Sequence, residues 1–379
     1  MAVHGSAPLW SEVNMPLNCG IIGLPTVGKT TIFTALTRVK AEISNYSSTK
    51  NPNIGIIAVP DSRLDKLSEM FKPRKKVPAT VEFVDIAGLA SAASKKEGAN
   101  QFLSHIRDSS VLAHVVRCFE DPDVPHVSNR VSPGDDIEML HVELALADLE
   151  TVDKRTEKLQ KELKDPAKKK DAERELAAYA KIRPVLQEGR PARSVALDPE
   201  EAEAVKRSFL ITMKKEIYVC NADEEGVRSG NPHIDAARKI AEAEGAECVI
   251  ICGKFESELA DLESEEEKAE FLAELGLKES GLSALIHAVY HLLGLRTFFT
   301  AGEDECRAWT IHVGDKAPAA AGVIHTDFEK GFIKAEVYRY DDLMQYGSEH
   351  AVKSAGKLRL EGKEYVVQDG DVMFIKFNV

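Results

Sequence analysis

The sequence lacks the features of a membrane or exported protein. It holds no run of about 18 apolar residues that would span a bilayer. Residues 1–15 carry no basic start followed by an apolar stretch and a cleavage site. We therefore expect a cytoplasmic protein that makes no membrane contact. Residues 1–15 show no apolar periodicity either, and we expect them to form a disordered leader.

Closely spaced cysteines are also absent. The six cysteines are scattered, and none forms the CxxC pair of a zinc site or redox centre. The nearest two, Cys248 and Cys252, fall across an apolar stretch, which favours packing as small hydrophobic side chains over metal ligation. The pattern therefore predicts reduced, mostly buried thiols.

The chain also lacks an excess of basic charge. It has 49 Lys and Arg against 62 Asp and Glu, a formal net charge of −13. Broad electrostatic wrapping of nucleic acid is therefore disfavoured, because that binding depends on phosphate neutralisation by Lys and Arg. Local basic clusters remain at 72–76 and 168–170, and a solvated loop is the simpler interpretation of each.

The length of 379 residues exceeds what one hydrophobic core supports, so we expect two or three domains. Short apolar runs alternate with helical patterns in residues 16–131, and the same texture returns in 210–294. This alternation predicts one discontinuous α/β domain. Its expected strands are 18–22, 81–84, 111–116, 217–220 and 248–251, with a helix at 282–293.

Residues 132–209 form an insertion rich in Lys, Glu, Ala and Leu. Apolar residues from Leu149 to Leu163 recur at alternating spacings of three and four, which is a heptad-like seam. Asp165 and Pro166 should end this helix, and a second helix at 171–186 should return antiparallel to the first. The insertion is therefore predicted to be a helical hairpin. It serves either as a spacer or as an arm that contacts a large partner.

Residues 295–379 change character again. Trp309, Ile311 and Val313 alternate with polar residues, as do the apolar residues at the C-terminus, and both patterns indicate strands. Residues 361–363 separate LRL from YVV in the manner of a hairpin turn, and 317–324 is predicted to be a short helix. A small α+β domain is expected.

The segment GLPTVGKT at 23–30 carries the clearest chemical signal. It matches the P-loop pattern GxxxxGK[ST], directly after an apolar strand and before a helical segment. Its glycines allow backbone N–H groups to face phosphates, and the following helix N-terminus adds positive potential. Lys29 is predicted to bridge the terminal phosphates and Thr30 to bind magnesium.

The segment VEFVDIAG reads as a strand that ends in DxxG. Asp85 would hold magnesium through water, and the N–H of Gly88 would sense a γ-phosphate. The polar stretch between the two motifs suits a switch loop, in which Thr49 is the candidate magnesium ligand. Ser47 and Ser48 are adjacent alternatives.

Asn221, Ala222, Asp223 and Glu224 follow a strand where GTPases carry NKxD. The Asp of NKxD accepts hydrogen bonds from guanine groups that adenine lacks. Glu224 is one methylene longer and the Lys is missing, so we expect relaxed specificity or a preference for ATP. Leu89 stands where Ras-like enzymes carry a water-orienting Gln, so the catalytic group comes from elsewhere or the rate is low.

These motifs resemble those of the YchF/Obg-like ATPase family, in family order, across residues 17–379. The segments GLPTVGKTT, VEFVDIAGL, EGANQFLSHIRD, NADE and WTIHVGDKAPAAAGVIHTDFEKGFIKAEV carry the resemblance. It implies an α/β P-loop NTPase G domain with an inserted α-helical coiled-coil hairpin at 132–209. It also implies a C-terminal α+β TGS domain of β-grasp form at 295–379.

The same resemblance implies magnesium and ATP binding and association with the ribosome, with its large subunit favoured. The basic clusters then become candidate contacts to ribosomal RNA. His126 is similar to a family histidine implicated in hydrolysis, and the alternative for it is an exposed loop residue without a role. Thr26 stands where the family usually has an Asn associated with potassium, so potassium stimulation is not expected.

The motifs and the resemblance together assign a catalytic role to Lys29 and His126 and the metal to Thr30, Thr49 and Asp85. The predicted nucleotide contacts are Gly23, Thr26, Val27, Gly28, Lys29, Thr30, Thr31, Gly88, Asn221, Ala222 and Glu224. The favoured hypothesis is a slow magnesium-dependent ATPase whose nucleotide state gates ribosome binding. A GTPase of conventional specificity and a nucleotide-stabilised adaptor without enzymatic activity are the alternatives.

Overall fold

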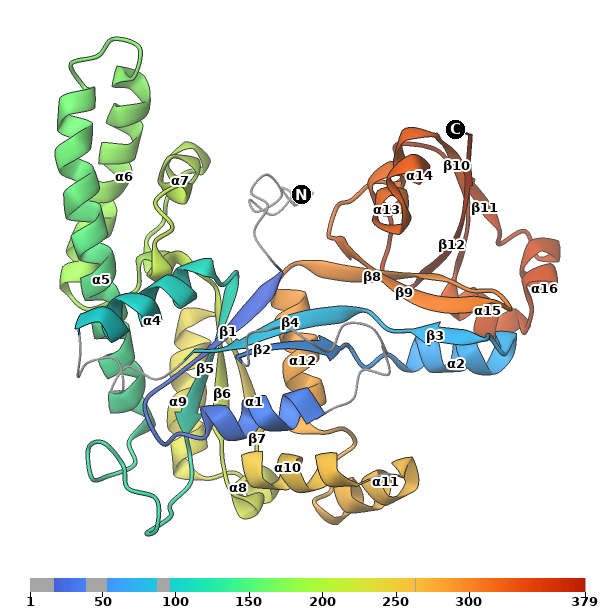
Figure 1. Cartoon of the computed structure of the whole chain (residues 1–379), viewed down its shortest axis with the longest axis horizontal. Helices are drawn as coiled ribbons and strands as arrows, with labels where there is room; N and C mark the ends of the chain where they lie inside the picture. The colour runs from blue at the N-terminus through green and yellow to red at the C-terminus, as the bar shows by residue number, and fades with distance from the viewer. Residues whose placement is uncertain (1–16, 39–52, 87–95, 263, 379) are drawn as a thin grey trace.

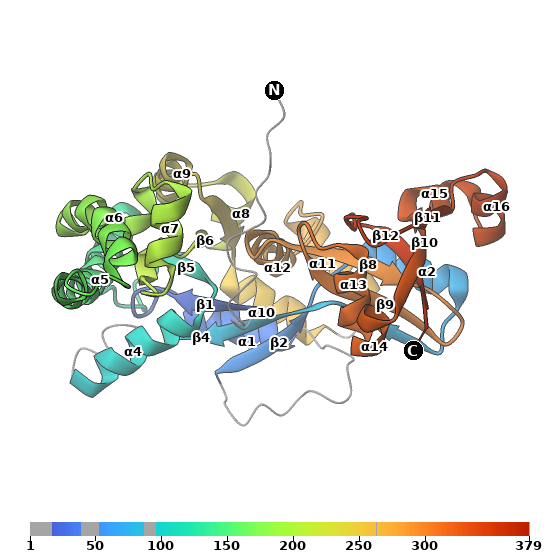
Figure 2. The same ribbon diagram turned by 90° about the horizontal axis from the view of Figure 1, so that it is seen from above.

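The computed structural model describes residues 17–38, 53–86, 96–262 and 264–378. The expected leader and the candidates Thr49 and Gly88 lie outside these ranges, as does Leu89. No helix of the described ranges is long and apolar enough to cross a membrane. We call 17–131 and 210–294 the nucleotide domain, the projecting part of 132–209 the helical arm, and 295–378 the C-terminal domain. In both views the sheet of the nucleotide domain lies between the other two parts (Figures 1 and 2).

The first sheet has six strands in the order β2-β4-β1-β5-β6-β7. β2 is antiparallel to β4, and the other neighbours are parallel. The strands predicted from apolar runs are all present, whereas β2 has no counterpart among them. The strands are β1 (Asn18–Ile22), β2 (Ile54–Ala58), β4 (Thr80–Asp85), β5 (Val111–Arg117), β6 (Glu216–Asn221) and β7 (Glu247–Ile251).

Helices cover both faces of this sheet, as a buried parallel sheet requires. Ile21 and Ile22 of β1 belong to different core clusters, because successive strand residues point to opposite faces. The Ile21 face packs on α1 and α12, and the Ile22 face packs on α4 and α5. The bounds are α1 (Lys29–Arg38), α4 (Lys96–Asp108), α5 (Pro133–Glu162), α8 (Glu224–Ser229), α9 (Pro232–Glu244), α10 (Gly253–Asp261), α11 (Glu265–Glu274) and α12 (Gly281–Leu292).

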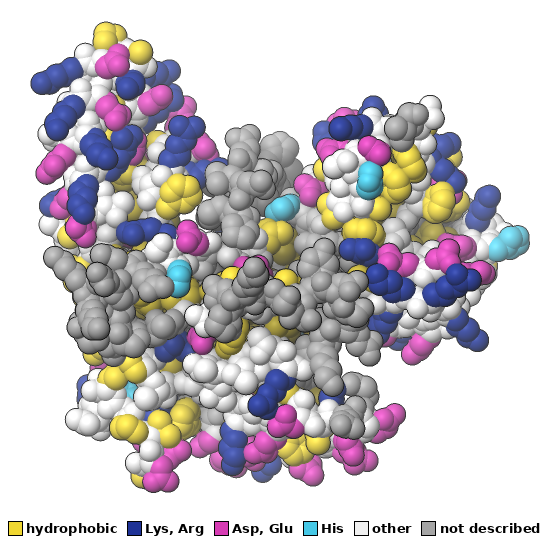
Figure 3. Space-filling view, in the orientation of Figure 1, with side chains coloured by type: hydrophobic (Ala, Val, Ile, Leu, Met, Phe, Trp, Pro, Cys, Tyr) yellow, Lys and Arg dark blue, Asp and Glu magenta, His cyan; other side chains and the backbone are white. Residues whose placement is uncertain are grey.

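The helical arm is built from α5 and α6 (Lys169–Gln187) and projects away from the sheet (Figure 1). Lys and Arg side chains are spread over its visible surface (Figure 3). The predicted break at 165–166 falls in the turn between the two helices. Val152 and Leu159 are fully buried in the seam, and α7 (Pro199–Lys206) packs on α6. α5 begins well before the predicted seam, because its first half packs against the nucleotide domain instead of α6.

The C-terminal domain contains a second sheet in the order β11-β10-β12-β8-β9-β3. The helix predicted at 317–324 is confirmed as α13. Three further helices accompany it in this domain. The strands are β8 (Leu295–Thr300), β9 (Glu305–His312), β10 (Phe332–Arg339), β11 (Arg359–Glu361) and β12 (Asp371–Phe377). The helices are α13 (Ala317–Ile324), α14 (Thr326–Lys330), α15 (Tyr340–Tyr346) and α16 (Glu349–Ser354).

The predicted hairpin around residues 361–363 is wrong. β11 pairs with β10, and Val366 forms a bridge with Lys316. The chain after the turn is drawn inward because Val367 is fully buried and its N–H donates to the carbonyl of Asp315 across 3.0 Å. The local alternation of apolar and polar residues identified β11 as a strand but did not identify β10 as its partner.

A strand from the nucleotide domain completes the C-terminal sheet. β3 (Lys75–Val77) follows α2 (Ser62–Phe71) and pairs in parallel with β9 (Figure 1). Helix α2 lies beside the C-terminal domain in both views. Nearby, Arg63 forms an ion pair with Asp369 at 2.6 Å. The segment between β2 and β4 therefore joins the two domains by backbone pairing and by charge.

Candidate nucleotide-binding site

The P-loop is fitted closely against its surroundings. Gly23 and Gly28 have positive φ angles of 150° and 98°. A Cβ atom at Gly23 would lie 2.5 Å from the carbonyl oxygen of Val115, and one at Gly28 would lie 2.2 Å from Nδ2 of Asn221. Only glycine therefore fits at these two positions. The loop rests on β5 on one side and on Asn221 on the other.

Lys29 is buried at the first position of α1. Its Nζ donates to the carbonyl oxygen of Leu24 across 2.7 Å, inside the loop. Burial lowers the pKa of the ammonium to about 8, although the carboxylate of Asp85 acts in the opposite direction. A buried cation at a helix N-terminus gains a counter-charge when an anion binds. The arrangement suits a phosphate group.

Thr30 and Asp85 bring oxygen atoms together at the C-terminal edge of the sheet. The hydroxyl of Thr30 donates to Oδ2 of Asp85 across 3.4 Å. Oδ1 of Asp85 is buried without a hydrogen-bond partner, and burial raises the pKa of this carboxyl. A buried, unpartnered carboxylate oxygen beside a hydroxyl is a donor set that fits a hydrated magnesium ion.

Asn221 ties three segments together at the end of β6. Its Nδ2 donates to the carbonyl of Val27 across 2.8 Å, and its Oδ1 accepts from the N–H of Gly253 at 3.0 Å. The side-chain amide therefore connects the P-loop to the turn between β7 and α10. Ala222 is buried next to it, and its N–H donates to the carbonyl of Ile251.

The remaining acidic residues of this segment have different positions. Oδ1 of Asp223 accepts from the N–H of Gly226 at 2.7 Å and caps α8. Glu224 is the exposed first residue of α8. Sequence reasoning missed Gly253, whose only signal is its place just beyond the C-terminal end of a parallel strand, where ligands bind in such sheets.

His126 lies in a loop that contacts the P-loop. The hydroxyl of Thr26, a residue with φ of 61°, lies 2.7 Å from the carbonyl oxygen of Pro25 and 2.9 Å from that of Pro125, and its proton is shared between them. His126 itself is buried, not exposed as one interpretation of the sequence held. Its Nε2 hydrogen-bonds Oδ2 of Asp136 at 3.0 Å, and its Nδ1 accepts from the N–H of Ser128 at 3.1 Å.

The guanidinium of Arg117 fixes the shape of the same loop. It is almost fully buried at the end of β5. It donates to the carbonyls of Phe119, Asp121 and Val124 at 3.1, 3.2 and 3.0 Å. Three hydrogen bonds from one planar group hold the backbone just before Pro125 in place.

Comparison with known proteins agrees with this geometry. The family model YchF-GTPase_C, described as a protein of unknown function, matches residues 295–378. The family model MMR_HSR1, described as a 50S ribosome-binding GTPase, matches residues 18–171. Relatives in Bacillus subtilis (strain 168) and Haemophilus ducreyi, both named "Ribosome-binding ATPase YchF", are 52% and 51% identical over 96% of this chain and 100% of their own length. The chain belongs to the YchF family.

A solved structure extends the likeness to three dimensions. The Schizosaccharomyces pombe YchF GTPase is similar with a TM-score of 0.85 and 36% identity, over 97% of this chain and 99% of that one. The family relation and this structure agree with the predicted G domain and C-terminal domain. The predicted Thr49 and Gly88 contacts fall in the parts of this YchF-family chain that the structure does not describe.

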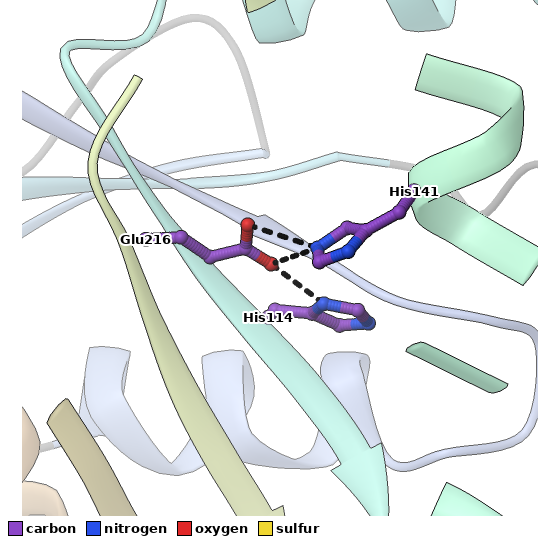
Figure 4. A group of neighbouring side chains, drawn as sticks. All are labelled: His114, His141 and Glu216. Atoms are coloured by element: carbon purple, nitrogen blue, oxygen red, sulfur yellow. Dashed lines mark hydrogen bonds and ion pairs between the residues drawn. The ribbon is translucent and has the colours of Figure 1, made fainter. Parts of the chain in front are cut away.

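A second buried polar group lies away from the nucleotide edge (Figure 4). Glu216 stands at the N-terminal start of β6, whereas the P-loop meets the C-terminal ends of the strands. Its carboxylate contacts Nδ1 of His114 at 2.7 Å, Nε2 of His141 at 3.3 Å and Arg193 at 2.6 Å. Because Arg193 already neutralises the carboxylate, we interpret the group as a hydrogen-bonded joint between α5 and the sheet and assign it no metal.

Proposed function

We propose that this chain is a magnesium-dependent P-loop protein that binds ATP, hydrolyses it slowly and associates with the ribosome. The observation that carries the proposal is the meeting of Lys29, Thr30 and Asp85 at one edge of the sheet. The relatives named "Ribosome-binding ATPase YchF" support both the substrate and the partner. A protein with this partner would act in the cytoplasm.

The phosphates would be held by the P-loop backbone, Lys29 and the residues at the start of α1. Thr30 and Asp85 would hold magnesium, with Thr49 as the proposed ligand from the switch segment and Gly88 as the proposed γ-phosphate sensor. Bound magnesium neutralises phosphate charge during transfer. Thr26 stands where the family usually has an Asn associated with potassium, and on that ground we propose that potassium does not stimulate this protein.

ATP preference follows from the residues beside the base site. Recognition of guanine needs a carboxylate acceptor at the fourth position of NKxD. Here Asp223 caps α8, and Glu224 has a longer side chain on that helix. Asn221 and Ala222 remain as proposed base-side contacts. The neighbour titled "YchF GTPase" keeps conventional GTP hydrolysis as the second candidate.

His126 is the proposed catalytic histidine, because Leu89 offers no group that orients water. Its loop contacts the P-loop through Pro125, so its backbone lies beside the nucleotide edge. A neutral imidazole can accept a proton from water or orient it. The conformation of the ring described above engages both nitrogens, and catalysis through His126 requires their release.

The arm is the proposed ribosome contact, with the large subunit as the favoured partner. Lys168, Lys169 and Lys170 are exposed at the turn of the arm, where phosphate groups of ribosomal RNA could be reached. The other basic cluster, at 72–76, is exposed as well, but several of its side chains face acidic partners. Arg74 and Lys75 pair with Asp304 and Glu305 at 3.5 and 3.8 Å, within the contact between the two domains.

The test is steady-state turnover of ATP and GTP with and without intact ribosomes. The proposal predicts slow ATP turnover that ribosomes stimulate and that Lys29→Ala abolishes. Faster turnover of GTP would favour the second candidate. Turnover that ribosomes leave unchanged, together with ribosome binding that ignores the nucleotide, would favour the adaptor.

A further inference from the structure

We propose that Asp136 is a latch, a positioning residue through which the helical arm withholds His126 from the nucleotide. The inference rests on the proposed catalytic role of His126. It adds a regulatory link that the P-loop and its metal ligands do not provide. In the latched state hydrolysis is slow, and displacement of the start of α5 releases the imidazole.

The latched ring has no nitrogen free for chemistry. Nε2 donates to Asp136 at 3.0 Å, and Nδ1 accepts the N–H of Ser128 at 3.1 Å. Only 4% of the His126 side chain is exposed, and 3% of that of Asp136. A general base must bring a free nitrogen within hydrogen-bond reach of its water. The ring must therefore turn out of both contacts, with Asp136 and with Ser128, before His126 can act as a base.

Asp136 belongs to the arm and not to the nucleotide loop. It lies in the first turn of α5, the 30-residue helix that continues into the projecting hairpin. Ile137 and Leu140, which follow it, pack into two core clusters of the nucleotide domain. Packed helices shift against a core by about 1–2 Å, so a load on the arm reaches Asp136 as a small displacement of the start of α5.

The contact between Asp136 and His126 is only partly satisfied, which favours its opening. Oδ1 of Asp136 is buried without a hydrogen-bond partner. An unpaired buried carboxylate oxygen costs free energy, which offsets part of what the contact with His126 contributes. Burial also raises the pKa of Asp136, in keeping with a carboxylate that is not fully satisfied.

The histidine side of the latch is anchored separately. Arg117 fixes the backbone of residues 119 to 124, and Thr26 holds Pro125 against the P-loop. When Asp136 leaves, the backbone of His126 therefore stays beside the nucleotide and only the ring has to turn. Docking of a large partner on the arm thus becomes a way to raise turnover without new catalytic groups.

The experiment compares basal ATP turnover of Asp136→Ala with that of the full-length wild type, without ribosomes. Loss of a charge-assisted hydrogen bond should raise kcat roughly tenfold. The affinity for ATP should stay unchanged, because Asp136 does not contact the P-loop. The matched control is Asp135→Ala, which removes the neighbouring, half-exposed carboxylate that pairs with Arg130 and should leave kcat unaltered.

The double variant Asp136→Ala/His126→Ala separates the latch from the catalytic assignment. The rise in kcat should vanish in it. A His126→Ala variant with wild-type turnover would refute the catalytic role itself. Wild-type or lower kcat in Asp136→Ala, with His126 still required, would overturn the latch alone. Nitrogen NMR of the imidazole adds a direct readout, because the Nε2–H that donates to Asp136 should shift upfield and exchange faster with solvent in Asp136→Ala. An unchanged Nε2 signal would contradict the latch, and retained ATP affinity shows that the variant folds.

Discussion

The hydroxyl of Thr30 and Oδ2 of Asp85 lie 3.4 Å apart, although 55 residues separate them in the chain. Thr30 lies in the first turn of α1 and Asp85 ends β4, so the pair joins the P-loop to the neighbouring strand. Two oxygens from the C-terminal ends of adjacent parallel strands meet where ligands bind in this class of sheet. This pairing supports the proposed magnesium site. It also predicts that the buried carboxylate lowers the stability of the protein when no metal is bound.

Replacing Asp85 by Asn should separate stability from metal binding. The raised pKa of Asp85 means that the folded protein disfavours its ionised form, so the charge is destabilising at pH 7. Asp85→Asn should therefore raise the stability of the nucleotide-free protein slightly, because the loss of attraction to Lys29 offsets part of the gain, and should abolish the magnesium dependence of nucleotide binding. Denaturant unfolding and magnesium titrations check the two effects. A variant that is less stable would contradict this account of the buried carboxylate.

Nucleotide affinity should fall as the pH rises above 8. The pKa of Lys29 is lowered by burial to about 8, so the free protein loses this positive charge above that pH. We expect the dissociation constant for ATP to rise up to roughly tenfold per pH unit there. Stability of the nucleotide-free protein should increase over the same pH window, because the unfolded state binds the extra proton. Lys29→Arg, which stays charged, is the control and should show a flat affinity profile.

Asn221→Ala should disable the site by removing its brace. The amide makes two buried hydrogen bonds, to the carbonyl of Val27 and from the N–H of Gly253. Their loss should cost about 2–4 kcal/mol of unfolding free energy and at least tenfold in nucleotide affinity. Thermal unfolding and nucleotide titration measure these losses. Asn231→Ala, which removes the cap of α9 outside the site, should lower stability but preserve affinity.

The ion pair between Arg63 and Asp369 should contribute to the contact between the two domains. Oδ1 of Asp369 also accepts the N–H of Thr297 at 2.9 Å. Asp369→Ala should destabilise the protein by about 1 kcal/mol, because the pair is only partly shielded from solvent. The control is Asp261→Ala, which removes the more exposed pair with Arg38 and should have almost no effect. Equal losses in both variants would argue against a structural role for the domain contact.

The sequence predicted the parts of the site that depend on local order. The P-loop was recognisable because its glycine pattern directly precedes Lys29 and Thr30. The strand ending at Asp85 was recognisable because an apolar run directly precedes that residue. The contact of Thr30 with Asp85 and the bracing by Asn221 needed the strand order, which no local pattern contains. The roles of Thr49 and Gly88 stay predictions.

Contacts between distant segments were the hardest to predict. Cys248 was grouped with Cys252 because of their spacing, yet its Sγ lies 3.4 Å from that of Cys220 on the adjacent strand. The pairing of β3 with the C-terminal sheet and the contact of His126 with Asp136 depend in the same way on tertiary structure. The residues next to His126 in the sequence are mostly polar, so nothing in the local pattern predicts that its side chain is buried.

The most direct test of the proposed function is a titration of nucleotide-free protein with fluorescent ATP and GTP analogues in magnesium buffer. Lys29→Ala serves as the binding-deficient control. We predict clearly tighter binding of the ATP analogue, lost in the control. Equal or tighter binding of the GTP analogue would contradict the assignment of ATP and move the protein to the GTPases of conventional specificity.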